Sequence, residues 1–548
     1  MLPVLAQTAT LPTLGASDLA ALAPELVVTV TALVLLLSAA TRGRLLLALA
    51  PSGAAAVATG LLLLRGGVGT AGALAVLLGL AAPGLVLALP GRPRLVRVWL
   101  AGLGLGAALL LTLAPVVGAV LGGASLVPEA AFAGSFAGDG ITFATRLTVL
   151  LTALLVLPLG HGYLNDRGIS RAEHEPLLLL AVVGMTLLGG ANDLITLFLA
   201  LELLSIALYV LVALARRDRR SQESGLKYLV LGAVASAILL YGIALTYVAT
   251  GTFELAAIGA RVGAITTSPG IVTLGLALLV VGFAFKVALV PFQLWTPDVY
   301  QGAPTNITAF MAAAVKAAAF AALLRLLLVA FGPLAALWAP LLAVLAAVTM
   351  LYGASAALVQ QDVKRILAYS SITHAGYATI GIVAASGEGL SATLWYLLTY
   401  AVSTLAAFGV VIAVERRRRG EVTLVDLRGL GRTSPVAAGL LALALLSLAG
   451  IPTTAGFLGK LAVFRAGIEA GWTWLVVVGV VSSVIAAGFY LRIAGLVFLE
   501  EPDPARGAPV LGVGLALAVS IAGLLVLSLG LQPQLVLQLL ADTAAILR

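Results

Sequence analysis

The sequence has no cysteine and few charged residues. Among its 548 residues, Asp, Glu, Lys and Arg together make up only 10%. Without thiolates, the chain can form neither a disulfide nor a cysteine-ligated iron–sulfur cluster. Its three histidines lie far apart in the sequence and suggest no metal site. We therefore expect no metal in this chain.

The hydrophobic fraction of the sequence is correspondingly high, at 61%. A soluble globular protein carries about 25% charged residues, which it needs to cover its surface. A chain surrounded by lipid has no such requirement. The composition therefore predicts an integral membrane protein. Residues 1–17 carry no positive charge and do not resemble a cleavable signal peptide.

Apolar runs long enough to cross about 30 Å of hydrocarbon recur along the whole chain. Backbone groups in lipid must form hydrogen bonds within their own segment, so each run predicts a helix. We expect an all-α polytopic membrane protein with about 16 transmembrane helices. They lie near residues 24–40, 44–64, 71–90, 98–121, 141–160, 174–191, 193–214, 226–249, 271–295, 305–331, 334–357, 365–385, 390–414, 434–468, 472–498 and 508–531.

Arginine clusters follow only odd-numbered helices in this series. Cytoplasmic loops are enriched in Lys and Arg, so this alternation predicts an outside N-terminus. An even number of helices then places the C-terminus outside as well. The clusters are Arg42/Arg44, Arg92/Arg94/Arg97, Arg167/Arg171, Arg216/Arg217/Arg219/Arg220, Lys364/Arg365 and Arg416 to Arg419.

Lysine is rare, and its positions differ from those of arginine. Lys and Arg total 31, of which five are lysine. Arginine keeps its proton in proteins, whereas the pKa of a buried lysine can shift by several units. The alternative for Lys227, Lys364 and Lys460 is a side chain that extends to the membrane interface and keeps its charge in water. That alternative fits Lys286 and Lys316 poorly, because each lies about ten or more residues from one end of its apolar run, so we interpret them as titratable groups.

Glu202 is a carboxylate well inside an apolar run, in NDLITLFLALELLSIALYVL (192–211). A lone charge there costs about 2.5 kcal/mol or more by insertion scales, so it needs a partner. Lys227, at the start of the next helix, is the nearest candidate. A structural ion pair and a proton relay both remain open, because each charge in such a pair tunes the other's pKa.

Two predicted helices are interrupted. The segment GFAFKVALVPFQLWTPDVYQGAP (282–304) contains Pro291 and Pro297, and LAGIPTTAGFLGK (448–460) contains Gly450 and Pro452. Proline removes a backbone hydrogen bond and breaks a helix. Interrupted helices at matching places in two halves are typical of inverted-repeat transporters. Repeats at 174–331 and 334–498 make each interrupted helix the fourth of five.

His374 lies in the apolar segment KRILAYSSITHAGYATIGIVA (364–384). One interpretation is a structural histidine in the core, with hydrogen-bond partners for its ring nitrogens. Its ordinary pKa of about 6.5 also makes histidine a natural proton carrier if water reaches it.

Taken together, these motifs resemble subunit N of bacterial NADH-quinone oxidoreductase (respiratory complex I), within the antiporter-like membrane subunit family. The resemblance covers about 1–65 and 129–531. The stretch DVYQGAP distinguishes subunit N from the other antiporter-like subunits. The other matching segments are NDLITLFLALELLS, SQESGLKYLVLGAVAS (221–236), FKVALVPFQLWTPDVYQGAPT (285–305), QQDVKRILAYSSITHAGY (360–377) and LSLAGIPTTAGFLGKLAVF (446–464).

The resemblance implies a proton relay through the membrane. Its members are Glu202, Lys227, Lys286, Lys316, His374 and Lys460, with Lys364 and Gln293 as further candidates. Gln293 stands where the family usually has histidine, and glutamine can only hydrogen-bond. Thr453 stands where a second proline is common.

The family usually has fourteen helices, whereas we expect about 16 in this chain. The difference suggests that two helices are inserted. We expect N-terminal helices at 1–130, including an apparent two-helix insertion near 66–128. A family helix and loop at 131–173 follow, then the two repeats, and then a C-terminal helix at 499–548.

The resemblance also implies the function. It predicts a proton-translocating membrane-arm subunit of NADH-quinone oxidoreductase in the bacterial cell membrane, with other complex I subunits as partners and no nucleic acid. NADH, FMN, iron–sulfur clusters and quinone are expected in partner subunits and not in this chain. The alternatives are a subunit of a cation/proton antiporter and a membrane scaffold that carries no ions.

Overall fold

Helices dominate the structure, which is a computed structural model that describes residues 15–40, 93–122, 129–264, 269–418, 420–503, 508–534 and 536. The helices expected near 44–64 and 71–90 lie outside the described residues. Within the described part, twelve helices are long and apolar enough to cross a membrane. This confirms the prediction of an all-α polytopic membrane protein.

The membrane-length helices follow the predicted apolar runs closely. Two further apolar helices, α7 (His174–Gly190) and α19 (Pro435–Ala449), are shorter. The twelve are α2 (Ala23–Ala40), α5 (Pro93–Gly122), α6 (Gly140–Asp166), α8 (Leu194–Val212), α9 (Arg219–Thr250), α11 (Pro269–Val287), the continuous helix from α13 (Thr305–Phe310) through α14 (Lys316–Arg325), α15 (Ala335–Leu358), α16 (Val363–Val383), α17 (Gly387–Arg418), α21 (Thr473–Leu499) and α22 (Val513–Leu531).

Short elements connect these helices. A small antiparallel sheet pairs β1 (Glu129–Ala131) with β2 (Phe136–Gly138), with Ala130 opposite Ala137. The remaining short helices are α1 (Ala16–Ala21), α10 (Leu255–Val262), α12 (Trp295–Gly302), α18 (Leu430–Thr433) and α20 (Ala455–Glu469), with π-helical turns η1 (Met311–Val315) and η2 (Leu326–Ala330) and 3-10 turns η3 (Gly332–Leu334) and η4 (Leu424–Leu427).

The first predicted interruption separates α11 from α12. Helix α11 ends at Val287, Pro291 lies in the connecting turn, and the indole of Trp295 at the start of α12 donates a hydrogen bond to the Phe285 carbonyl at 2.9 Å. The prediction that Pro297 also breaks the helix is wrong. Pro297 lies in the first turn of α12, where the backbone N–H that proline lacks has no partner in the helix anyway.

The second predicted interruption divides the apolar run at 434–468. Helix α19 ends at Ala449, and Gly450 adopts the left-handed conformation with φ 86°. Glycine reaches this region without steric cost. Pro452 lies in the following turn, and α20 begins at Ala455. Interrupted helices therefore occur in both halves of the chain, as predicted, whereas the proposed domain boundaries stay a prediction.

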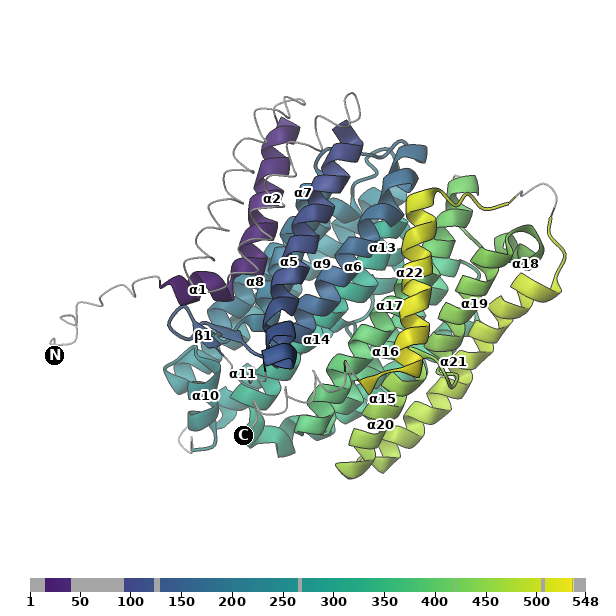
Figure 1. Ribbon diagram of the computed structural model, residues 1–548. Coiled ribbons are helices and arrows are strands. Elements are labelled where there is room, and N and C mark those ends of the chain that lie inside the picture. Colours follow the sequence, from purple (N-terminus) through teal and green to yellow (C-terminus); the bar gives the residue numbers. More distant parts are fainter. Residues whose placement is uncertain are drawn as a thin grey trace.

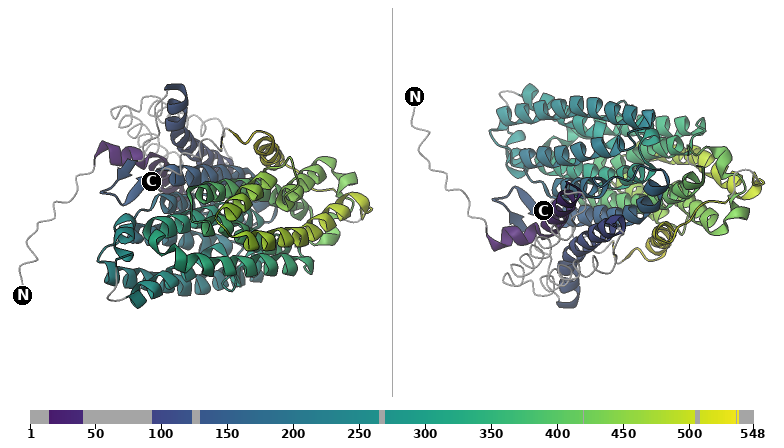
Figure 2. Two further views of the ribbon diagram at one scale, coloured as in Figure 1. Left: turned by 90° about the horizontal axis from the view of Figure 1, so that it is seen from below. Right: turned by 90° about the horizontal axis from the view of Figure 1, so that it is seen from above.

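The two halves lie at opposite ends of the molecule. Figure 1 shows the blue and teal helices towards one end and the green and yellow-green helices towards the other, and both views of Figure 2 agree. The last helix, α22 (yellow), returns to contact α6 and α17 near the middle. Helix α5, which the sequence assigned to an insertion, contacts both α2 and α6.

The arginine clusters in the described residues share one face. Arg416 forms an ion pair with Asp166 at 2.7 Å, and Arg220 pairs with Glu421. Arg94 donates a hydrogen bond to Asn165 at 2.9 Å, which brings the N-terminus of α5 to the same side. We call this side the arginine-rich face.

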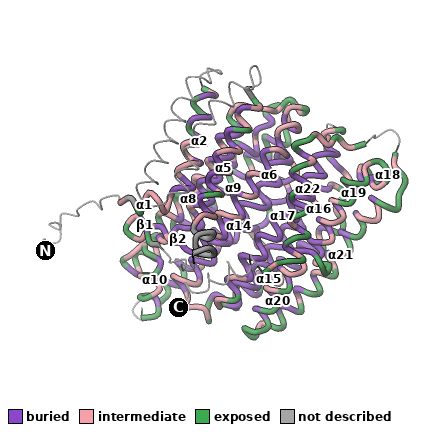
Figure 3. The backbone as a smooth tube through the Cα atoms, viewed as in Figure 1, coloured by how far each residue is buried: buried purple, intermediate pink, exposed green. Residues whose placement is uncertain are grey.

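Burial is greatest along the centre of the bundle. Helices α16 and α17 are buried across their whole spanning windows, and the continuous helix α13–α14 nearly so. Figure 3 shows buried residues through the middle of the molecule and exposed residues along α10, α20 and α21. A polar side chain on a central helix therefore needs partners from within the protein.

Candidate functional site

Lys286 occupies the last turn of α11, directly before the first interruption. Its ammonium group donates hydrogen bonds to the hydroxyl groups of Ser205 at 2.8 Å and Tyr228 at 3.1 Å. The ammonium nitrogen also lies 5.3 Å from the centroid of the Tyr228 ring. These contacts hold a buried amine that has no direct carboxylate partner among the residues that the structure describes.

Glu202 lies on α8 near the same group. Its carboxylate accepts a hydrogen bond from the Ser236 hydroxyl of α9. A small cavity is lined among others by Lys286, by its partner Ser205 and by Ser236, the partner of Glu202. The hydroxyl groups of Ser205 and Ser236 at this cavity are suited to bind water between Ser236 and Lys286.

The predicted pairing of Glu202 with Lys227 is wrong. Helices α8 and α9 run antiparallel, so Tyr209 meets Tyr228 with ring centroids 4.9 Å apart, and Glu202 meets Ser236. Lys227 precedes Ser236 by nine residues, or about 13 Å along the helix axis. Glu202 and Lys227 are therefore close in the sequence but too far apart along the bundle to form a pair.

Lys227 instead belongs to a surface ion-pair cluster at the arginine-rich face. Its ammonium group lies 2.7 Å from Glu223 and 2.9 Å from Asp298, and its side chain is 42% exposed. Asp298 also pairs with Arg365 at 2.9 Å. These contacts support the alternative of an interfacial lysine for this position.

Lys316 begins α14, directly after the π-helical turn η1. Its ammonium group donates to the Ser371 carbonyl at 2.5 Å and to the Ser371 hydroxyl at 2.6 Å. It also lies 5.8 Å from the centroid of the Tyr400 ring. Single π-helical turns are frequent at functional sites, and this one lies directly before Lys316.

Lys460 lies on α20, after the second interruption. Its ammonium group donates to the carbonyl of Ala449 and to the hydroxyl of Ser483, each at 2.8 Å. Ala449 is the last residue of α19, and a cation is favourable at the negative end of a helix. The ammonium group also lies 4.8 Å from the centroid of the Tyr377 ring.

His374 lies between the two tyrosine rings over which the ammonium groups of Lys316 and Lys460 lie. Its imidazole centroid is 4.8 Å from that of Tyr400 and 5.6 Å from that of Tyr377. All three side chains are buried. His374 is therefore the one imidazole in the described residues that bridges the surroundings of two buried lysines.

The interfacial alternative fails for Lys364 and Lys460. Lys364 is only 6% exposed and donates to the Ala303 carbonyl at 2.7 Å, just past the end of α12. Lys460 is 5% exposed. Gln293 lies buried within the first interruption, and its side-chain oxygen has no hydrogen-bond partner within the part of the chain that the structure describes.

Two interior ion pairs, one buried and one partly buried, are not predicted by the sequence analysis. Arg325 on α14 binds Asp139 through two hydrogen bonds of 2.6 and 2.7 Å, and Arg146 on α6 binds Glu25 at 2.8 and 2.7 Å. The signal was available, since both arginines lie inside predicted apolar runs. The pattern of arginine clusters in the loops does not include these two arginines.

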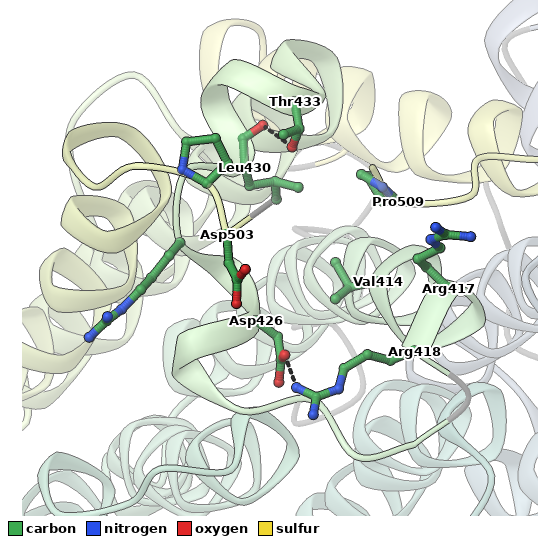
Figure 4. Close-up of a pocket in the computed structure, with 10 residues that line it drawn as sticks. Val414, Arg417, Arg418, Asp426, Leu430, Thr433, Asp503 and Pro509 are labelled. Atoms are coloured by element: carbon green, nitrogen blue, oxygen red, sulfur yellow. Dashed lines mark hydrogen bonds and ion pairs between the residues drawn. The ribbon is translucent and has the colours of Figure 1, made fainter. Parts of the chain in front are cut away.

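A separate pocket lies where α17 ends at the arginine-rich face. Arg417, Arg418, Asp426 and Asp503 are among its lining residues. Figure 4 shows Arg418 reaching Asp426, with which it forms an ion pair. Its lining residues include none of the buried lysines.

Comparison with known proteins decides the family. Residues 191–486 match the family described as NADH:quinone oxidoreductase/Mrp antiporter, TM. The chain belongs to this family. Its matched region contains Glu202, His374 and all five lysines.

Two curated relatives of the chain share one name. The chain is 51% identical over 379 residues to the NADH-quinone oxidoreductase subunit N of Rhodococcus opacus, covering 68% of this chain and 69% of the relative. It is 40% identical over 407 residues to the protein of the same name from Laribacter hongkongensis, covering 74% and 84%.

Solved structures share the fold. A chain of respiratory complex I from Thermus thermophilus with bound aureothin is 37% identical, with a TM-score of 0.69, and 86% of this chain and 99% of that chain are covered. A chain of the Mrp complex from Dietzia is 26% identical, with a TM-score of 0.73, and the coverage is 86% and 96%.

Proposed function

We propose that this chain is the N-type membrane-arm subunit of an NADH-quinone oxidoreductase and that it translocates protons. The relatives with up to 51% identity carry that name. The observation that supports the transport role is the set of three buried lysines, Lys286, Lys316 and Lys460, each of which lies over a tyrosine ring. A scaffold would gain nothing from such costly groups.

The relay begins at Glu202 and ends at Lys460. Lys286 and Ser236, the hydrogen-bond partner of Glu202, line one small cavity. Lys316 follows on the next membrane-length helix, and His374 stands between the tyrosine rings over which Lys316 and Lys460 lie. Water completes the gaps that the side chains leave. An amine that alternates between charged and neutral forms passes a proton at each step, which arginine cannot do.

Redox chemistry belongs to partner subunits in this proposal. NADH, FMN, iron–sulfur clusters and quinone bind there, and this chain receives only the energy of their reaction. We place the chain in a bacterial cell membrane, with the arginine-rich face in the cytoplasm and both termini outside.

Purification of the native complex tests the assignment. A tagged chain should copurify with flavin and iron–sulfur subunits and with NADH:quinone reductase activity that generates a proton gradient. The similarity to the Mrp chain makes a cation/proton antiporter the second candidate. Copurification with membrane subunits alone, together with NADH-independent cation exchange, would establish that alternative.

A further inference from the structure

His374 has a hydroxyl partner at each ring nitrogen. Nδ1 lies 2.5 Å from the hydroxyl oxygen of Tyr396 on α17, and Nε2 lies 3.1 Å from that of Tyr490 on α21. The Tyr490 hydroxyl also lies 2.5 Å from the Ser370 hydroxyl on α16. Four side chains from three helices thus form one continuous hydrogen-bonded chain.

The spacing on α16 explains how this chain forms. Ser370 and His374 are four residues apart, so they lie on the same face of the helix. Tyr490 on α21 reaches both and closes the gap between them. All four side chains are buried, so these contacts are formed where water is scarce.

We propose that Tyr396 and Tyr490 are proton-transferring residues of the relay, with His374 as the group between them. The inference rests on the proposed function and deepens it. A neutral imidazole has one N–H donor and one acceptor nitrogen, whereas a hydroxyl group can both donate and accept. Every member of the chain can therefore receive a proton on one side and release one on the other.

The transfer balances. When Nδ1 of His374 carries the proton, the Tyr490 O–H bond breaks as an N–H bond forms at Nε2, and Tyr490 takes the hydroxyl proton of Ser370. The Nδ1 proton passes to Tyr396, whose own proton leaves. One proton enters at Ser370 and one leaves at Tyr396, and the imidazole ends in its other tautomer. The chain resets when the hydroxyl protons rotate and the imidazole ring turns, so that its N–H again faces Tyr396 and its acceptor nitrogen again faces Tyr490.

The position of the chain matches this role. The Tyr400 ring, which contacts Lys316, and the Tyr377 ring, which contacts Lys460, both pack against His374. A proton that leaves the surroundings of one lysine for those of the other meets the chain on its way. Tyrosine is also poorly suited as a mere filler here, because a buried hydroxyl requires a partner.

Removal of single hydroxyl groups tests the proposal. Tyr490→Phe and Tyr396→Phe keep the rings and remove the hydroxyl oxygens. We expect each to lower proton uptake and coupled quinone reduction by about tenfold or more in assembled complexes, since positioned acid–base groups contribute roughly 10²-fold or more. The control is Tyr163→Phe, which removes a buried hydroxyl that donates to Glu415 at 2.9 Å on another part of the bundle. It should retain most activity.

A fluorinated side chain separates transfer from positioning. A tyrosine that carries fluorine next to its hydroxyl group is more acidic but keeps the hydrogen bonds. Placed at position 490, it should change the rate and the solvent deuterium isotope effect of pumping. An unchanged isotope effect would contradict proton transfer through Tyr490, even if Tyr490→Phe is inactive or fails to assemble.

His374→Gln, measured in parallel, distinguishes the two levels of the argument. Normal pumping by His374→Gln would contradict the proposed function of His374 itself. If His374→Gln loses pumping while both tyrosine variants pump as well as Tyr163→Phe, only the role of the tyrosines is wrong.

Discussion

The ammonium group of Lys460 caps the broken end of α19 by donating a hydrogen bond to the Ala449 carbonyl at 2.8 Å. The interruption and the lysine are thus parts of one arrangement. The break exposes a helix end inside the protein, and the lysine occupies that end as a cation that can lose its proton. A continuous helix would offer no free carbonyl at this depth.

We predict that Lys460→Met abolishes most proton pumping in complexes that still assemble. Methionine has a similar length but no titratable group. The matched control is Arg465→Met on the same helix, since Arg465 forms only an exposed pair with Glu469 at 2.7 Å. Such pairs contribute about 0.2–1 kcal/mol, so this control should pump normally. Equal pumping by the two variants would contradict the role given to Lys460.

Glu202 can be neutralised with little change in shape. Glu202→Gln can still accept the hydrogen bond from Ser236 but cannot carry a proton. We expect a strong loss of proton uptake and of coupled quinone reduction. Glu223→Gln, which weakens an exposed contact with Lys227, serves as the control. Normal pumping by an assembled Glu202→Gln complex would remove Glu202 from the relay.

The ion pair between Arg325 and Asp139 predicts a loss of stability. Both side chains are almost fully buried, and removal of one partner from such a pair costs about 3–5 kcal/mol. Arg325→Met should therefore lower the thermal stability of the purified complex or its yield. The double variant Arg325→Met/Asp139→Leu should recover part of the loss, because it leaves no unpaired charge. A double variant no more stable than Arg325→Met would contradict this account.

The orientation can be tested with single cysteines, because the chain has none of its own. Glu254→Cys should react with an impermeant reagent from outside the cell. Arg418→Cys, at the arginine-rich face, should react only after the membrane is opened. The reverse pattern would place the arginine-rich face outside.

The sequence predicted the helices and both breaks because apolar runs and prolines act locally. The same reasoning failed where side chains meet across helices. Lys227 is the nearest basic residue on the next helix in the sequence, yet antiparallel packing separates it from Glu202 by about two and a half turns. Tyr396 and Tyr490 are 22 and 116 residues away from His374. No local pattern distinguishes them from tyrosines that only fill space.

The central claim is that the buried lysines work by releasing protons and not by fixed charge. Lys316→Arg tests it, since guanidinium remains charged. Lys364 is buried, so Lys364→Arg would not be a matched control. Lys227 is half-exposed and ion-paired at the arginine-rich face, so the relay that we propose from the structure does not include it. Lys227→Arg keeps its contacts.

The deciding measurement is proton uptake per electron in vesicles that contain the reconstituted complex, with assembly checked on native gels. The account predicts that Lys316→Arg loses most of its proton uptake while Lys227→Arg keeps most of it. Equal proton uptake by the two variants would show that Lys316 is only a fixed positive charge.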